Sequence, residues 1–181
     1  MERSLEFSQR ADKSLFRLRG GTFQVLNSAK SRWRPVPSLR VRLQAVMDGR
    51  AKPPRISMTL GMKLVKLSEG SATMTMAVGR RFHNPMGTLH GGIMTDLADA
   101  AMGIATVSTL ADDETFTTLE LKMNFLRPVV EGVITGEGTV LHRGRKIVLS
   151  EAVVRDDEGR LVAKGTATQM IMEAQKGRRK K

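Results

Sequence analysis

The chain of 181 residues contains no cysteine. Without a thiol the protein has no cysteine nucleophile, no thiolate metal site and no disulfide. No Gly-x-Ser-x-Gly segment is present, which argues against a serine nucleophile on an elbow turn. A P-loop is also missing, and Gly136-Glu137-Gly138 lacks the third glycine of a dinucleotide-binding loop. His83, His90 and His142 show no metal-ligand spacing, so we expect neither a metal nor a bound cofactor.

Aromatic residues are scarce, at 4% of the chain, whereas 12 methionines are available to fill a core. The N-terminus shows no apolar segment followed by a small-residue cleavage site. No run of about 18 apolar residues occurs without a charge, so a membrane span is not predicted. We therefore expect a cytoplasmic protein.

The net charge of +12 is concentrated at the two ends of the chain. Residues 1–55 hold 13 Lys/Arg against 4 Asp/Glu, and residues 173–181 hold 5 against 1. The part between them is close to neutral. We expect a basic, weakly ordered extension over residues 1–37, one folded domain over 38–172, and a basic tail over 173–181. Contact of these ends with nucleic acid or an anionic membrane is the alternative to simple solvation.

The folded part begins with a short helix capped by Ser38 and ending near Met47. Two strands with alternating apolar residues follow, over 62–67 and 71–78. The segment 91–110 is rich in alanine and apolar nearly all round, which predicts a helix buried on every side.

Four more strands are expected over 117–126, 133–142, 146–155 and 160–172. A helix that is apolar on all sides needs a sheet that wraps it, and a second subunit to cover what the sheet leaves open. The predicted fold class is therefore α+β: a hotdog fold, in which a curled antiparallel sheet wraps one long central helix.

The polar segment 84–92 turns at Gly91-Gly92 into this helix, which carries two acids, Asp96 and Asp99. Gly91 would offer a backbone N–H at the positive end of the helix dipole. An unpaired carboxylate in an apolar helix is costly and has a raised pKa, so it indicates either a partner or a function. Geometry alone does not choose between the two acids.

Three separate segments resemble the phenylacetate-pathway (PaaI-type) hotdog thioesterases. They are Phe82-His83-Asn84-Pro85-Met86-Gly87-Thr88-Leu89-His90-Gly91-Gly92, Asp99-Ala100-Ala101-Met102-Gly103, and Thr117-Thr118-Leu119-Glu120-Leu121-Lys122-Met123-Asn124-Phe125-Leu126-Arg127-Pro128. The resemblance covers roughly residues 38–172. An acid at the position of Asp96 departs from the family pattern.

The resemblance implies an acyl-CoA thioesterase with a specific set of site residues. The Gly91 amide would bind the oxyanion, with His90 beside it. Asp99 would act as general base or as nucleophile. Asn84 would contact substrate or water, or would simply stabilise a turn before Pro85. Thr118 would place water or the acid, from the polar face of its strand.

Arg143, Arg145 and Lys146 cluster at a hairpin of the neutral domain and are candidates for binding the phosphates of coenzyme A, or are simply solvated. We expect a homodimer, and the family implies a homotetramer built as a dimer of dimers. The predicted reaction converts acyl-CoA to a free carboxylic acid and coenzyme A. The alternative is a non-catalytic module that binds acyl-CoA for regulation.

Overall fold

The computed structural model describes residues 37–174. The predicted basic extension and basic tail lie outside the described residues, apart from the inner end of each. No helix in the described range is long and apolar enough to cross a membrane.

The predicted helices and strands of the domain are present, with ends displaced by a few residues at most. The helices are α1 (Leu39–Met47), α2 (Arg55–Leu60) and α3 (Gly91–Val107), with a 3-10 turn η2 (Arg80–Phe82). The strands are β1 (Lys63–Ser68), β2 (Ser71–Val78), β3 (Glu114–Phe125), β4 (Gly132–Arg143), β5 (Ile147–Arg155) and β6 (Leu161–Glu173).

The sequence did not predict α2, because Pro53-Pro54 indicated only a break. Pro54 in fact precedes the first helical residue, where its missing N–H costs nothing. Gly61 ends this helix at φ 78°, a left-handed conformation that suits glycine.

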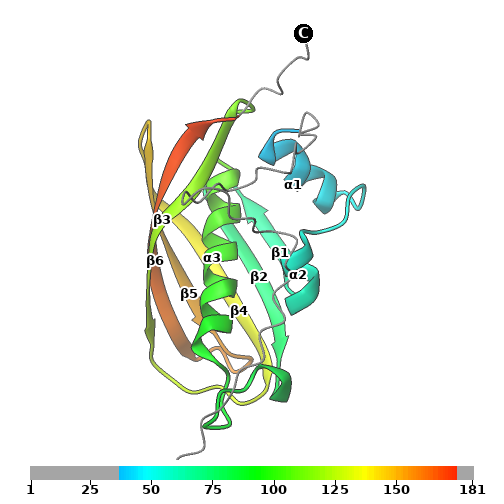
Figure 1. Cartoon of the computed structure of the whole chain (residues 1–181), viewed down its shortest axis with the longest axis vertical. Coiled ribbons are helices and arrows are strands. Elements are labelled where there is room, and N and C mark those ends of the chain that lie inside the picture. The colour runs from blue at the N-terminus through cyan, green and yellow to red at the C-terminus, as the bar shows by residue number, and fades with distance from the viewer. Residues whose placement is uncertain (1–36, 175–181) are drawn as a thin grey trace, which may run out of the picture. The chain divides into compact units, whose positions relative to one another are not determined.

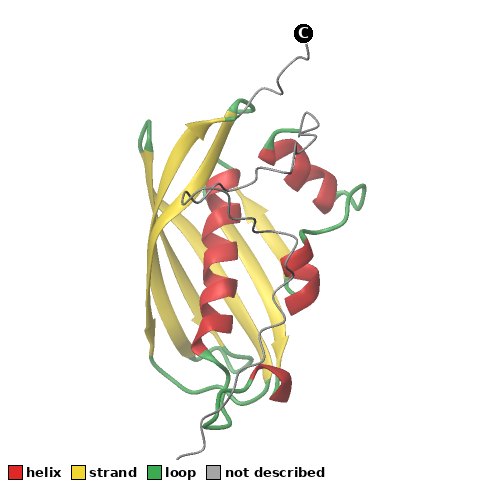
Figure 2. Cartoon of the chain, viewed as in Figure 1, coloured by secondary structure: helices red, strands yellow, loops and turns green. Residues whose placement is uncertain are grey.

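All strands belong to one antiparallel sheet in the order β1-β2-β4-β5-β6-β3, with β1 and β3 at the edges. The sheet curls, and α3 lies lengthwise along its concave side (Figure 1). Figure 2 shows the short helices on the same side as α3, next to the β1 edge. This arrangement confirms the predicted hotdog fold.

Methionine fills much of the core between α3 and the sheet, as the scarcity of aromatic residues predicts. Met74 and Met76 point inward from β2, whereas Met94 and Met102 point outward from α3 toward them; each is 3% exposed or less. The strict alternation in β2 therefore puts its apolar face on the helix.

The expectation that α3 is buried all round holds only for the side that faces the sheet. Leu97, Ala98 and Ala101 on that side are inaccessible to solvent. On the opposite side Gly92 and Asp96 are exposed, and Asp99 is half-buried. Residues 37–174 therefore leave one face of α3 open, and this face carries both acids.

Glycine in β4 allows α3 to lie directly on the sheet. A Cβ on Gly138 would lie 2.5 Å from the carbonyl oxygen of Ala101 and 2.6 Å from the amide nitrogen of Met102. Both neighbours are backbone atoms of α3, so no side-chain rotation could relieve the contact. Gly138 thus fixes the depth at which the helix, and the acids on it, lie in the sheet.

Candidate active site at the start and middle of α3

One asparagine organises the polar loop before α3. Asn84 Oδ1 accepts hydrogen bonds from the amides of Met86 (2.9 Å) and Thr88 (3.3 Å), and its Nδ2 donates to Thr88 Oγ1 (3.0 Å). The Asn84 amide donates to the Thr88 carbonyl at 2.8 Å. These contacts give Asn84 the turn role; its contact with substrate or water stays a prediction.

His90 caps α3 and orients its first turn. Its Nδ1 accepts a hydrogen bond from the Gly92 amide at 2.9 Å, which satisfies one of the amides that a helix start leaves unpaired. The backbone of His90 is tied to the loop, because its amide donates to the Phe82 carbonyl at 2.9 Å. The imidazole therefore lies directly beside the Gly91-Gly92 turn.

The Gly91 amide is the first of α3 and has no hydrogen-bond acceptor among residues 37–174. A side chain at this position would meet a phenyl ring, since a Cβ would lie 2.9 Å from Phe125 Cζ. Glycine is thus needed for the close approach of β3 to the helix start. A half-exposed N–H at the positive end of a helix dipole can stabilise a developing oxyanion.

Asp99 lies two turns further along α3, half-buried among apolar neighbours. Burial raises the pKa of its carboxyl, and the negative charge of Asp96 raises it further. A hydrogen bond from Thr118 Oγ1 to Asp99 Oδ1 (3.2 Å) acts in the opposite direction and lowers the pKa. The result is a carboxyl with a raised pKa and one fixed hydrogen-bond donor.

Thr118 reaches Asp99 because of a β-bulge that the sequence did not reveal. Thr118 pairs with Gln169 and Glu120 pairs with Thr168, so Leu119 is an extra residue without a partner. The regular alternation of a strand is therefore interrupted at this point of the predicted segment 117–126. The bulge turns Thr118 toward α3, on the same side of the sheet as Leu121, and leaves Leu119 55% exposed.

Asp96 lies one turn before Asp99 and is exposed to solvent. Side-chain hydrogen bonds from the described residues reach Asp99 but not Asp96. Of the two acids that the sequence left open, only Asp99 therefore combines partial burial with a positioned partner.

Of the predicted basic cluster, Arg143 is half-buried and already has partners. Its Nη2 bonds Glu114 Oε2 at 2.7 Å, and it also donates to the carbonyl of Gly144. Arg145 and Lys146 are exposed at the β4–β5 turn. Arg143 lies at the end of β4 next to the start of β3, which follows the C-terminal end of α3, whereas Gly91 lies at its N-terminal end. The structure therefore does not bring this cluster to the Gly91 amide of the same chain.

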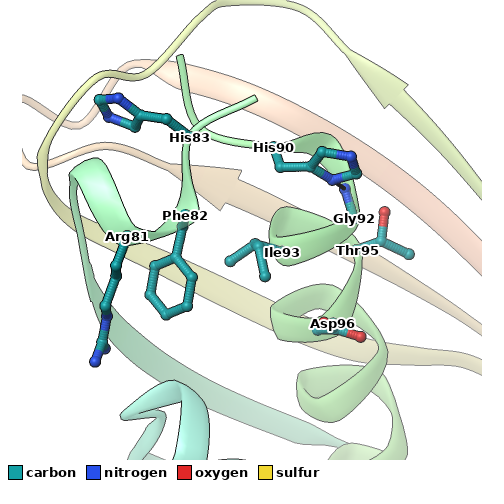
Figure 3. A pocket seen from close by; sticks show the side chains of 8 residues that line it. All are labelled: Arg81, Phe82, His83, His90, Gly92, Ile93, Thr95 and Asp96. Carbon is teal, nitrogen blue, oxygen red and sulfur yellow. Dashed lines mark hydrogen bonds between the residues drawn. The ribbon is translucent and has the colours of Figure 1, made fainter. Parts of the chain in front are cut away.

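A hollow of about 540 Å³ adjoins the start of α3. It is lined by Arg81, Phe82, His83, His90, Gly92, Ile93, Thr95 and Asp96. Arg81 and Phe82 lie side by side on one wall, with Ile93 and Asp96 of α3 opposite (Figure 3). Sequence reasoning missed this surface, although Arg80-Arg81-Phe82 combines two cations with an aromatic ring immediately before the loop.

The residues that the structure describes contain no group of three or more His, Cys, Asp or Glu side chains arranged for a metal. The candidate site combines a helix-start amide, a histidine cap and a carboxylate with a raised pKa. Together with the curled sheet, these features define a hotdog-fold hydrolase.

Comparison with known proteins agrees with this class. Residues 86–163 match the model of the thioesterase superfamily. A Saccharolobus solfataricus protein that bears an esterase name is 32% identical over 130 residues, covering 72% of this chain and 92% of the relative. The 1,4-dihydroxy-2-naphthoyl-CoA hydrolase of Listeria monocytogenes is 27% identical over 118 residues, covering 65% and 96%.

A solved structure from Ralstonia eutropha, described as a phenylacetic acid degradation-related protein, superposes with a TM-score of 0.66. The two sequences are 30% identical, and the match covers 70% of this chain and 97% of the Ralstonia chain. The chain therefore belongs to the thioesterase superfamily and is a thioester hydrolase of the PaaI type. The matched region includes His90, Gly91, Asp99 and Thr118.

Proposed function

We propose that the protein hydrolyses acyl-CoA to a free carboxylic acid and coenzyme A. The observation that carries the proposal is Asp99, a half-buried carboxyl with a raised pKa and a hydrogen bond from Thr118, on the helix that begins at Gly91, whose amide has no acceptor in the described part of the chain. The Listeria relative is named as a hydrolase of a CoA thioester, which supports the same class of substrate.

In this reaction the thioester carbonyl accepts a hydrogen bond from the Gly91 amide, and its oxygen becomes negative as the carbon is attacked. Asp99 acts in one of two ways: it takes a proton from the attacking water, or it attacks the carbon itself and forms an anhydride that water then opens. In both cases the carbon–sulfur bond breaks and the thiolate of coenzyme A takes up a proton. Thr118 holds the Asp99 carboxyl in place.

His90 and Asn84 support the oxyanion site in this proposal. His90 fixes the turn that presents the Gly91 amide, through its bond to Gly92. Asn84 keeps the preceding loop closed and presents its remaining Nδ2 hydrogen to substrate or water. Arg145 and Lys146 remain candidates for contact with the phosphates of coenzyme A.

The active site needs two copies of the chain. Gly91 and Asp99 lie eight residues apart on one straight helix, which separates them by ~12 Å along its axis. One carbonyl cannot contact both. We infer that a partner lies on the open face of α3 with its own helix antiparallel, so that Gly91 of one chain and Asp99 of the other flank the substrate. The exposed edge strand β3 is where two sheets can join.

Mixed dimers test this shared site. Co-expression of Asp99→Ala with Gly91→Pro gives mixed dimers in which one of the two sites carries neither change. We expect about a quarter of wild-type activity, because half of the dimers are mixed and each has one intact site. Each variant alone should be inactive. Mixtures that stay inactive would show that each chain carries its own complete site.

The expected homotetramer would need a second interface, for which the convex side of the sheet is the candidate. Ile147, Leu149 and Met172 point outward there and are 37–42% exposed. A cytoplasmic location, where acyl-CoA is available, completes the proposal. Light scattering of the purified protein measures the assembly.

Thiol release from a panel of aliphatic and aromatic acyl-CoA thioesters tests the activity and identifies the acyl group. Asp99→Ala should reduce hydrolysis by about 10²- to 10⁴-fold, as expected for the loss of an acid–base group, and should keep a wild-type circular dichroism spectrum. Asp96→Ala is the matched control and should retain most activity. Acyl-CoA binding without thiol release by the wild type would favour the regulatory module instead.

A further inference from the structure

The hollow beside the start of α3 is directly connected to the proposed oxyanion site. His90 and Gly92, the residues on either side of Gly91, both line it. Phe82 and Ile93 give it an apolar part, and Arg81 and His83 add polar groups. A substrate whose carbonyl meets the Gly91 amide would extend one of its two arms across this surface.

Arg81 is exposed and makes two contacts on the wall of the hollow. Its guanidinium carbon lies 4.3 Å from the centroid of the Phe82 ring, within the range of a cation–π contact. Its Nη2 donates to the carbonyl of Leu60 at 3.2 Å, the last residue of α2. These two contacts order the side chain but use only one of its five N–H groups.

The charge of Arg81 is not neutralised within the described part of the chain, where no carboxylate lies within ion-pair distance of it. Arg143, by contrast, is paired with Glu114. An ordered guanidinium with unused donors is well suited to bind a phosphate. Asp96, which would repel an anion, lies on the opposite wall of the hollow (Figure 3).

We propose that this hollow binds the coenzyme A arm of the substrate, with the phosphates contacting Arg81. The amide and methylene groups next to the sulfur would cross Phe82 and Ile93, and the pyrophosphate would reach the guanidinium. This site differs from the Arg145–Lys146 hairpin. The identity of the ligand rests on the proposed acyl-CoA hydrolysis.

Calorimetric titration with coenzyme A and with pantetheine, which lacks the nucleotide and phosphates, tests the proposal. Arg81→Gln removes the charge and should weaken coenzyme A binding about tenfold, the effect of one charge-assisted hydrogen bond, while pantetheine binding stays unchanged. Arg80→Gln is the matched control, because this neighbour is exposed, carries the same charge and does not line the hollow. It should bind both ligands like the wild type. Added salt should weaken coenzyme A binding by the wild type more than by Arg81→Gln.

Turnover gives a second readout. KM for benzoyl-CoA should rise about tenfold in Arg81→Gln, whereas KM for the same acyl group on N-acetylcysteamine should not change. Coenzyme A binding that depends on Arg81 in a protein that releases no thiol would sink the proposed hydrolysis and leave this site standing. Thiol release that is unchanged in Arg81→Gln would leave the proposed hydrolysis standing and refute this site.

Four further results would overturn the proposal. They are no binding of coenzyme A to the wild type, an equal loss of both ligands in Arg81→Gln, an equal effect of Arg80→Gln, and an altered oligomeric state of Arg81→Gln. The last would show that Arg81 supports the contact between subunits rather than the ligand. Weakening by Arg145→Gln with Lys146→Gln, but not by Arg81→Gln, would place the phosphates at the hairpin.

Discussion

Replacing Gly138 by alanine tests whether the contact between β4 and α3 sets the position of Asp99, the proposed catalytic acid. The new Cβ would lie 2.5 Å from the Ala101 carbonyl oxygen and 2.6 Å from the Met102 amide nitrogen. Ordinary contacts of a Cβ begin near 3.4 Å. Because both neighbours are backbone, the helix must move away from the sheet by about 1 Å.

The cost follows from this shift. Overpacking a core costs ~1–3 kcal/mol, and a contact between two backbones belongs at the upper end of that range. For a chain of this size, a loss of ~3 kcal/mol lowers Tm by roughly 6–12 °C. Asp99 is two residues from Ala101 on the same helix, and a displacement of ~1 Å at a catalytic group can reduce the rate about 100-fold.

Urea unfolding measures the free energy of unfolding, and thiol release measures the rate. Gly79→Ala is the control, because a Cβ there meets no atom within 4 Å and its φ of 174° is open to any residue. Its stability should stay unchanged or rise by up to ~1 kcal/mol. A Gly138→Ala protein with a free energy of unfolding within ~0.5 kcal/mol of wild type would refute the reasoning.

Three further predictions concern the site. The Asp99→Asn protein should have a higher free energy of unfolding than wild type at neutral pH and an equal one in acid. Burial raises the Asp99 pKa, so wild type loses stability as pH rises through that pKa. Urea unfolding at both pH values measures the difference, and the opposite trend would contradict the prediction. Thr118→Val should move the acidic limb of the pH–rate profile to higher pH, because it removes a hydrogen bond that holds the pKa of Asp99 down, whereas Thr117→Val should leave the limb in place. Gly91→Pro should lose about 10²- to 10³-fold more thiol-release activity than Gly91→Ala. Both variants add a Cβ against Phe125, but only proline removes the N–H. Equal losses would exclude the amide as oxyanion donor.

The main helix and strands could be predicted because their periodicity agrees with their burial. Alternation in β2 and the apolar run of α3 both correspond to faces that pack on each other. The cap at Ser38 was also readable, since its Oγ accepts from the Val41 amide at 3.2 Å. In these segments a local pattern and the tertiary contact require the same residues.

The missed features depend on tertiary context. The bulge at Leu119 is set by pairing with β6, which is more than 40 residues away, and a strand with an extra residue has no local signal. The ion pair of Arg143 with Glu114 joins residues 29 apart. The separation of Gly91 and Asp99 followed directly from the predicted helix, whereas the proposal of a shared site also rests on the open face of α3, which only the structure reveals.

The bulge ties the hydroxyl beside the acid to one pairing of β3 with β6. If the extra residue were absorbed into the ladder, Leu119 would pair with Gln169 and take the inward position that Thr118 now holds. An apolar side chain would then replace the hydroxyl beside Asp99, and Phe116 would leave its contact with Gly103 for solvent. Thr117 is therefore no substitute for Thr118, and the acid keeps its hydrogen-bond donor only while the extra residue stays in β3.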